Sequence, residues 1–249
     1  RLDVKKKVTE EVAERFFWEQ TMHNPDDDLR GKPFESILDQ NVYLLGMKNG
    51  VYDLTTHSMR AGRCEDYITM STHLEYSIQN DFGWDHPDVL NIMTFFDQVL
   101  PCERVRNFVL LLLASFMDGH TGKEQFHVWV GCGGNGKSKI IELFQRTMGD
   151  YCGTGSITLL TSRRPDSNAP TPDLVATKGK RFVILQEPNE NEKIQVGKMK
   201  ELTGGDKITC RALHKEPIEF KPQFTMVLAC NHLPSVPADD GGTWRRMCV

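Results

Sequence analysis

The segment Gly131-Cys-Gly-Gly-Asn-Gly-Lys-Ser138 constrains this chain more than any other, because it fits G-x-x-x-x-G-K-[ST] at every fixed position. The apolar run Phe126–Val130 precedes it, and a helical pattern from Lys137 to Met148 follows. Between a strand and a helix, glycines let backbone N–H groups turn inward around a phosphate, and the helix N-terminus adds partial positive charge. The segment therefore predicts a nucleotide-binding loop.

Each position of this loop has an expected role. Lys137 would bridge the β- and γ-phosphates, and Ser138 would hold Mg²⁺. The other positions would line the phosphates. The expected nucleotide-binding residues are Gly131, Cys132, Gly133, Gly134, Asn135, Gly136, Lys137, Ser138 and Lys139.

Two further apolar runs, Phe182–Leu185 and Phe224–Ala229, have the composition of buried strands. Buried strands that alternate with helices indicate an α/β fold with a mostly parallel sheet covered on both faces. The first run leads into Glu187, which could hold Mg²⁺ through water or polarise the attacking water. Gln186 stands where an Asp is usual, so Glu187 does both jobs or Glu190 contributes. The second run leads into Asn231, which could contact the γ-phosphate.

Basic side chains gather in two places after the loop. Residues 193–221 carry seven basic and four acidic side chains, and within them Ile208–Phe220 reads as strand, turn and strand. His214 and Lys215 would lie near the tip, where they could grip a phosphodiester backbone. Arg245 and Arg246 follow a turn, and they form either a surface salt-bridge cluster or an arginine finger supplied by a neighbouring subunit.

The nucleotide loop alone leaves several protein classes open. A guanine-specific GTPase is disfavoured, because the nearest base-reading segment, Thr177-Lys-Gly-Lys180, lacks the required Asp. A P-loop kinase of a small molecule remains possible. A nucleotide-gated scaffold on DNA that does not hydrolyse efficiently is also open, because of Gln186.

The first part of the chain has a different pattern. We expect a helix over residues 4–22, a two-stranded ribbon whose turn takes its positive φ angles from Asn49-Gly50, and an extended piece from Tyr67 to Tyr76. After a turn-rich break, helices are expected at Val89–Leu100 and Glu103–Met117. The ten-residue apolar stretch Phe108–Met117 is half the roughly 20 residues that a bilayer requires, so we expect a buried helix. The predicted domains are 1–92, α+β, and 93–249, the nucleotide-binding core.

Composition excludes several classes. The chain has 249 residues and a net charge of −4, but residues 1–100 carry −8 and the rest +4, so a polyanionic partner would meet the second part. Seven scattered cysteines without a Cys-x-x-Cys pair argue against a disulfide framework and fit a reducing, intracellular location. The eight histidines show no metal-binding spacing. A start at Arg1 suggests a fragment of a longer protein.

Together these motifs resemble a superfamily 3 helicase of the AAA+ class, and more narrowly the primase–helicase proteins of large DNA viruses, phages and plasmids. The segment Leu44–Leu54 is similar to the domain that precedes the helicase in that family. The stretches that carry the resemblance are Gly131–Ser138, Lys180–Pro188, Met199–Asp206 with Arg211, and Ala229–Pro234 followed by Trp244-Arg245-Arg246.

The resemblance implies a ring, typically a hexamer, that hydrolyses ATP with Mg²⁺ at subunit interfaces and threads single-stranded DNA in the 3′ to 5′ direction. Lys137, Ser138, Glu187 and Asn231 would act within a subunit, and Arg245 or Arg246 would act on the neighbour. Arg211, His214 and Lys215 would contact DNA. Residues 1–92 would form a collar or a DNA-entry module, and a primase domain or replication factors would be partners. No membrane is involved, and the location would be host cytoplasm or nucleus for a virus, and cytoplasm for a phage or plasmid. The core sheet is expected to be incomplete at Val249.

Overall fold

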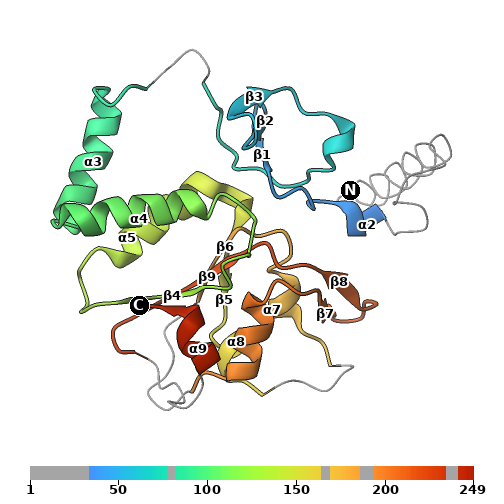
Figure 1. Ribbon diagram of the computed structural model, residues 1–249. Helices are drawn as coiled ribbons and strands as arrows, with labels where there is room; N and C mark the ends of the chain where they lie inside the picture. Colours follow the sequence, from blue (N-terminus) through green and yellow to red (C-terminus); the bar gives the residue numbers. More distant parts are fainter. Residues whose placement is uncertain (1–33, 78–81, 164–168, 186–192, 234–240) are drawn as a thin grey trace.

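The computed structural model describes residues 34–77, 82–163, 169–185, 193–233 and 241–249 (Figure 1). The helix expected over residues 4–22 lies outside these ranges. Up to residue 115 the elements are α2 (Phe34–Ile37), β1 (Leu44–Met47), β2 (Gly50–Asp53), β3 (Ser58–Arg60), η1 (Cys64–Asp66), α3 (Pro87–Val99) and α4 (Glu103–Ser115). From residue 126 they are β4 (Phe126–Val130), α5 (Lys137–Met148), η2 (Gly149–Tyr151), β5 (Cys152–Gly155), α6 (Thr158–Thr161), α7 (Pro172–Val175), β6 (Phe182–Leu185), α8 (Val196–Thr203), β7 (Ile208–Cys210), β8 (Ile218–Phe220), β9 (Thr225–Cys230), α9 (Gly241–Arg246) and β10 (Met247–Cys248).

The expected ribbon is the first part of a three-stranded antiparallel sheet, β1-β2-β3. The hairpin is confirmed, with Met47 paired to Gly50 around a turn of Lys48 and Asn49. The expected positive φ angle is found at Gly50, where φ is 154°, but not at Asn49. Gly50 also permits a close approach, since a Cβ there would lie 2.4 Å from the carbonyl oxygen of Arg60 on β3.

The segment from Tyr67 to Tyr76 lies beside β1 but forms no strand. The Thr72 amide donates to the Gly46 carbonyl at 2.9 Å, and the Lys48 amide donates to the Leu74 carbonyl at 2.9 Å. These two bonds do not build a continuous ladder. The expected extended piece therefore covers the edge of the small sheet.

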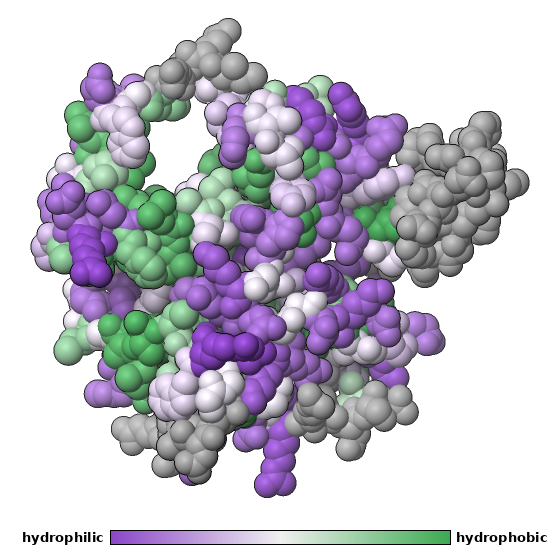
Figure 2. Space-filling model, viewed as in Figure 1, coloured by the Kyte–Doolittle hydropathy of each residue, from purple (hydrophilic) through white to green (hydrophobic). Residues whose placement is uncertain are grey.

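Helices α3 and α4 are confirmed within two residues of their expected ends, but the expected burial of Phe108–Met117 is wrong. Leu113 and Phe116 are buried, whereas Phe108 is 59% and Leu111 is 71% exposed. A helix covered from one side buries only one face, and α4 packs on α5 near its C-terminal end (Figure 1). Figure 2 shows the resulting apolar surface over α4 at the left of the view. Within the described residues, no helix has the length and apolarity to cross a bilayer.

A parallel five-stranded sheet in the order β10-β4-β9-β6-β5 forms the centre of the second part. Chain order and spatial order differ, because β9 lies between β4 and β6. The predicted limits of β4, α5 and β6 match the structure, and those of β9 differ by one residue at each end. The last strand, β10, adds Met247 and Cys248 beside β4.

Both faces of this sheet are buried, as expected for a parallel sheet. On β6, Phe182 and Ile184 face a cluster with α4 and α5, while Val183 and Leu185 face a cluster with α6 and α8. Figure 1 shows α4 and α5 on one side of the sheet and α8 and α9 on the other. The α/β fold class predicted from the sequence is confirmed.

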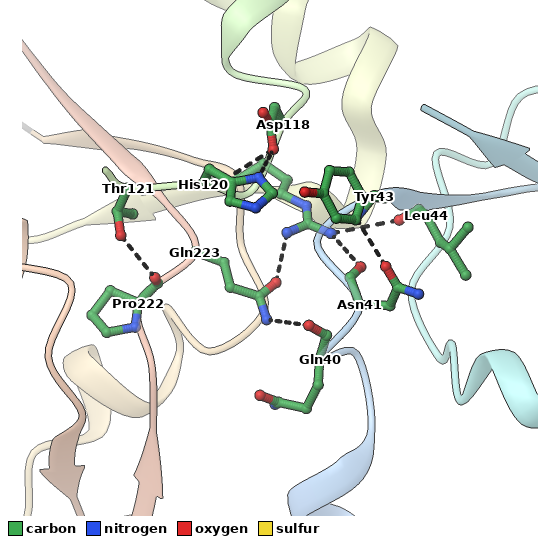
Figure 3. Close-up of polar contacts among 10 residues, drawn as sticks. Gln40, Asn41, Tyr43, Leu44, Asp118, His120, Thr121, Pro222 and Gln223 are labelled. Atoms are coloured by element: carbon green, nitrogen blue, oxygen red, sulfur yellow. Dashed lines mark hydrogen bonds and ion pairs between the residues drawn. The ribbon is translucent and has the colours of Figure 1, made fainter. Parts of the chain in front are cut away.

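A buried arginine joins the small sheet to the large one. The Arg181 guanidinium is 1% exposed and donates to Gln223 Oε1 at 2.6 Å and to the Asn41 carbonyl oxygen at 2.9 Å. Figure 3 shows Asn41, Leu44 and Gln223 gathered around this group. Burial lowers the pKa of Arg181, although Tyr151 and more distant carboxylates oppose the shift.

Candidate nucleotide-binding site

The loop Gly131–Ser138 connects β4 to α5 as the sequence predicts. Gly134 and Gly136 have φ angles of 78° and 84°, which side-chain-bearing residues rarely adopt. At Gly136 space is also short, because a Cβ would lie 2.4 Å from Val99 on α3. The loop therefore depends on glycine both for its backbone conformation and for its packing against α3.

The N-terminus of α5 has no side-chain cap, although the Lys139 amide already donates to the Gly136 carbonyl at 3.0 Å. Its N-cap residue is Gly136, no side chain caps it, and no acidic residue lies in its first turn. Gly133 and Gly134 face open space, since no atom would lie within 4 Å of a Cβ on either. Unpaired N–H groups at a helix N-terminus favour anions. These residues fit a phosphate group.

The Lys137 side chain folds back over the loop. Its Nζ donates to the carbonyl oxygen of Gly131 and, at 3.2 Å, to Asn135 Oδ1. The ammonium group of Lys137 thus lies against the same loop that would bind the phosphate oxygens. Lys139 points elsewhere, because its Nζ contacts Glu142 Oε2 at 2.8 Å with the side chain 71% exposed. Its amide donates to the Gly136 carbonyl, so a contact of Lys139 with phosphate stays a prediction.

The ends of β9 and β6 lie at the same edge of the sheet as the loop. Val130 pairs with Cys230, and the Gly131 amide donates to the Cys230 carbonyl at 3.3 Å, so Asn231 follows directly beside the loop. Leu185 pairs with Leu228 on the other side of β9. Glu187, Gln186 and Glu190 lie outside the described residues, and the role of Glu187 stays a prediction.

Ligands of open parallel sheets bind at the carboxyl ends of the strands, where the strand order reverses. The loop and Asn231 occupy that position. Among the residues that the structure describes, no cluster of three or more His, Cys, Asp or Glu side chains could hold a metal ion. Mg²⁺ in nucleotide sites needs only one or two protein oxygens besides phosphate and water, so Ser138 and Glu187 remain its expected ligands.

The predicted hairpin is present, with Ile208 paired to Phe220 and Cys210 to Ile218. His214 and Lys215 lie exposed in the turn, where His214 has a φ of 58° and the Lys215 amide donates to the Ala212 carbonyl at 3.2 Å. Sequence reasoning missed Leu213 at the same tip, which is 62% exposed. The tip therefore presents an imidazole, an ammonium group and an apolar side chain together.

Arg211 directly follows β7, at the start of the loop that joins the two strands of this hairpin. Its amide donates to Thr171 Oγ1 at 3.1 Å, and its carbonyl accepts from the Thr171 amide at 2.8 Å. The side chain is half-buried. Arg211 thus has its backbone tied to Thr171, while His214 and Lys215 lie exposed in the same loop, and a DNA contact by Arg211 stays a prediction.

Arg245 and Arg246 lie at the other edge of the sheet. Met247 pairs with Phe126, so Arg245 is level with Glu124, just before β4 begins. The five residues of β4, roughly 16 Å at ~3.3 Å per residue, separate this end of the sheet from the nucleotide loop. Both arginines bind Glu124 Oε2 at 2.7 Å. No sequence motif points to Glu124, which sequence reasoning missed.

The fold and the loop together define an α/β protein with a P-loop type of core. The family described as D5 N terminal like matches residues 25–110, and a family of unknown function, DUF5906, matches residues 129–246. The predicted boundary at residues 92–93 stays a prediction.

Curated relatives come from large DNA viruses. A protein of Acanthamoeba polyphaga mimivirus named as a candidate helicase, L207/L206, is 42% identical over 85% of this chain and 22% of its own length. A protein of African swine fever virus named as a candidate primase, C962R, is 28% identical over 88% of this chain and 23% of its own length. The predicted resemblance to viral primase–helicase proteins is confirmed. The chain spans about a fifth of the length of these relatives.

A solved structure, the apo C-terminal region of NrS-1, is 15% identical and covers 63% of this chain and 36% of that chain, with a TM-score of 0.48. This value is too low to add to the fold described above.

Proposed function

We propose that this chain is the ATPase part of a superfamily 3 DNA helicase that acts in viral DNA replication. The observation that carries the proposal is the loop Gly131–Ser138, with two positive-φ glycines, an uncapped helix N-terminus and Lys137 folded over it. The relatives named as helicases and primases support DNA as the partner.

ATP hydrolysis follows from the residues at the carboxyl edge of the sheet. Lys137 and the amides of α5 hold the β- and γ-phosphates, Asn231 contacts the γ-phosphate, and Glu187 orients the attacking water. Mg²⁺, held by Ser138 and Glu187, would supply charge that offsets the phosphate oxygens.

Completion of the site requires a second subunit. Because Arg245 and Arg246 lie at the opposite edge of the sheet from the loop of their own chain, they are suited to the site of a neighbour. Head-to-tail contacts form rings where the rotation between subunits closes, and a hexamer that encircles single-stranded DNA is the proposed assembly. The hairpin tip with His214 and Lys215 would contact the strand, and a primase domain or replication factors are proposed partners.

The test is ATP hydrolysis by the purified chain with and without single-stranded DNA. Lys137→Ala should lower turnover by about a hundredfold or more, because a preorganised charge at the transferring phosphate is lost. Lys48→Ala, which removes an exposed lysine paired with Glu75, is the control and should keep normal turnover. Equal hydrolysis by wild type and Lys137→Ala would refute the proposal.

A further inference from the structure

One carboxylate oxygen holds both arginines at the amino edge of the sheet. Glu124 Oε2 accepts from Arg245 Nη2 at 2.7 Å and from Arg246 Nη2 at 2.7 Å. The parallel pairing of β10 with β4 brings these residues level, since Met247 is the partner of Phe126. The pairing of β10 with β4 in the core sheet therefore places Glu124 next to the two arginines.

The two arginines differ in exposure. The Arg246 side chain is 12% exposed and also donates to the Gly242 carbonyl oxygen at 3.1 Å, within α9. The Arg245 side chain is 68% exposed. The largely buried Arg246 thus anchors the Glu124 carboxylate, whose side chain is 34% exposed, while Arg245 is held at the surface by the same oxygen.

Glu124 adopts a backbone conformation that is unfavourable for its residue type. Its φ angle is 51°, and its amide donates to the Thr121 carbonyl at 3.0 Å in the turn before β4. Non-glycine residues in the left-handed region persist only where surrounding structure holds them, and they gather at functional sites. The backbone of this turn thus adopts an unfavourable conformation in which the Glu124 carboxylate contacts the two arginines.

We propose that Glu124 is a positioning residue that, with Arg246 as its anchor, holds Arg245 ready for the nucleotide site of the neighbouring subunit. The inference rests on the proposed function, because it requires a site that a neighbour completes. It assigns the finger to Arg245 and a supporting role to Arg246.

Isolated surface ion pairs contribute little to stability, and a purely structural Glu124 is the alternative. The two roles differ in where the defect appears. A structural defect stays within the altered chain. A positioning defect lowers the activity of the nucleotide site on the next subunit. A neighbour with an intact Glu124 and Arg245 can restore the activity of that site.

The experiment measures ATP turnover of Glu124→Gln, alone and mixed with Lys137→Ala. Glu124→Gln keeps the size of the side chain and removes its charge. Alone, it should lower kcat by about tenfold or more without raising KM, because an interaction made only in the transition state is weakened. In the mixture, an intact loop from one chain meets an intact arginine from the other, so turnover should rise above that of either variant alone.

Controls separate the possible failures. Glu75→Gln, at an exposed ion pair with Lys48, should keep wild-type turnover. When the double variant Glu124→Gln with Lys137→Ala is mixed with wild type, the ATP turnover should not exceed that expected from the wild-type subunits alone. Arg245→Ala should behave like Glu124→Gln, with an unchanged melting temperature because its side chain is exposed.

Three outcomes overturn the inference. The first is a wild-type kcat for the Glu124→Gln variant. The second is a lowered kcat of Glu124→Gln that does not rise on mixing with Lys137→Ala, although the same mixing restores turnover to Arg245→Ala. Both leave the proposed function standing, provided that Lys137→Ala alone is inactive. A wild-type chain without ATP turnover would overturn the proposed function and this inference with it.

Discussion

His127, on the strand that leads into the nucleotide loop, has an environment that disfavours its charged form. The side chain is 5% exposed, and its ring lies 5.6 Å from that of Phe116. Burial, with a smaller effect of Lys123, lowers the pKa of His127 from 6.5 to about 4. The imidazole therefore stays neutral in the folded chain at pH 7.

This shift predicts a pH-dependent stability. Below pH 6.5 the unfolded chain takes up a proton at His127 that the folded chain does not bind until about pH 4, so stability falls as the pH drops through this window. Thermal unfolding between pH 7.5 and 4 should show a shallower loss of melting temperature for His127→Gln than for wild type. His57→Gln, at an exposed site, is the control. An identical slope in all three proteins would contradict the buried neutral imidazole.

At the scale of elements, the β7–β8 hairpin separates its structural residues from its exposed ones. Ile208 and Phe220 are buried at the base, whereas Leu213, His214 and Lys215 are exposed at the tip. A phosphodiester strand can be gripped at the tip without disturbing the core. Binding and folding can therefore be altered independently in this hairpin.

Lys215→Ala should spare basal ATP turnover and lose most of its stimulation by single-stranded DNA, because the charge that meets the phosphates is removed. Lys207→Ala provides a matched change just before β7, at the base of the hairpin, and should keep the stimulation. Turnover is measured across a DNA titration at fixed salt, since phosphate contacts weaken as salt rises. Full stimulation of the Lys215→Ala variant would rule out the tip as a DNA contact.

At the scale of the whole molecule, Arg181 connects regions that are far apart in sequence. It joins the segment before β1, through Asn41, to Gln223 just before β9. A side chain at residue 119 would collide with its guanidinium group, which explains Gly119 at that position. The N-terminal sheet is thus held on the core partly by one buried cation with neutral partners.

Arg181→Ala should lower the free energy of unfolding by about 2–4 kcal/mol, because the side chain of Gln223 and the Asn41 carbonyl lose their donor inside the protein. Denaturant unfolding measures the change. Arg104→Ala, at an exposed position of α4, should leave stability within about 0.5 kcal/mol of wild type. If Arg181→Ala lowers the free energy of unfolding no more than Arg104→Ala does, the buried cation is dispensable.

Much of the core around the parallel sheet was predictable, because its signals are local. The apolar run of β4, the glycines of the loop and the helical period of α5 occur within 23 consecutive residues, and their limits match the structure. Neither β3 nor β5 was predicted. β5 contains two glycines and little apolar surface, and its strand conformation comes from pairing with β6.

The sequence by itself determined the fold class, the glycine-rich loop between β4 and α5, and the viral primase–helicase resemblance, since each depends on residue types at short, fixed spacings. Only the tertiary structure decided that Asn231 lies beside the loop, that α4 leaves Phe108 exposed, and that Glu124 holds Arg245 and Arg246. These relations depend on which strands pair and in which register. Pairing joins segments 100 or more residues apart, and no local pattern encodes it.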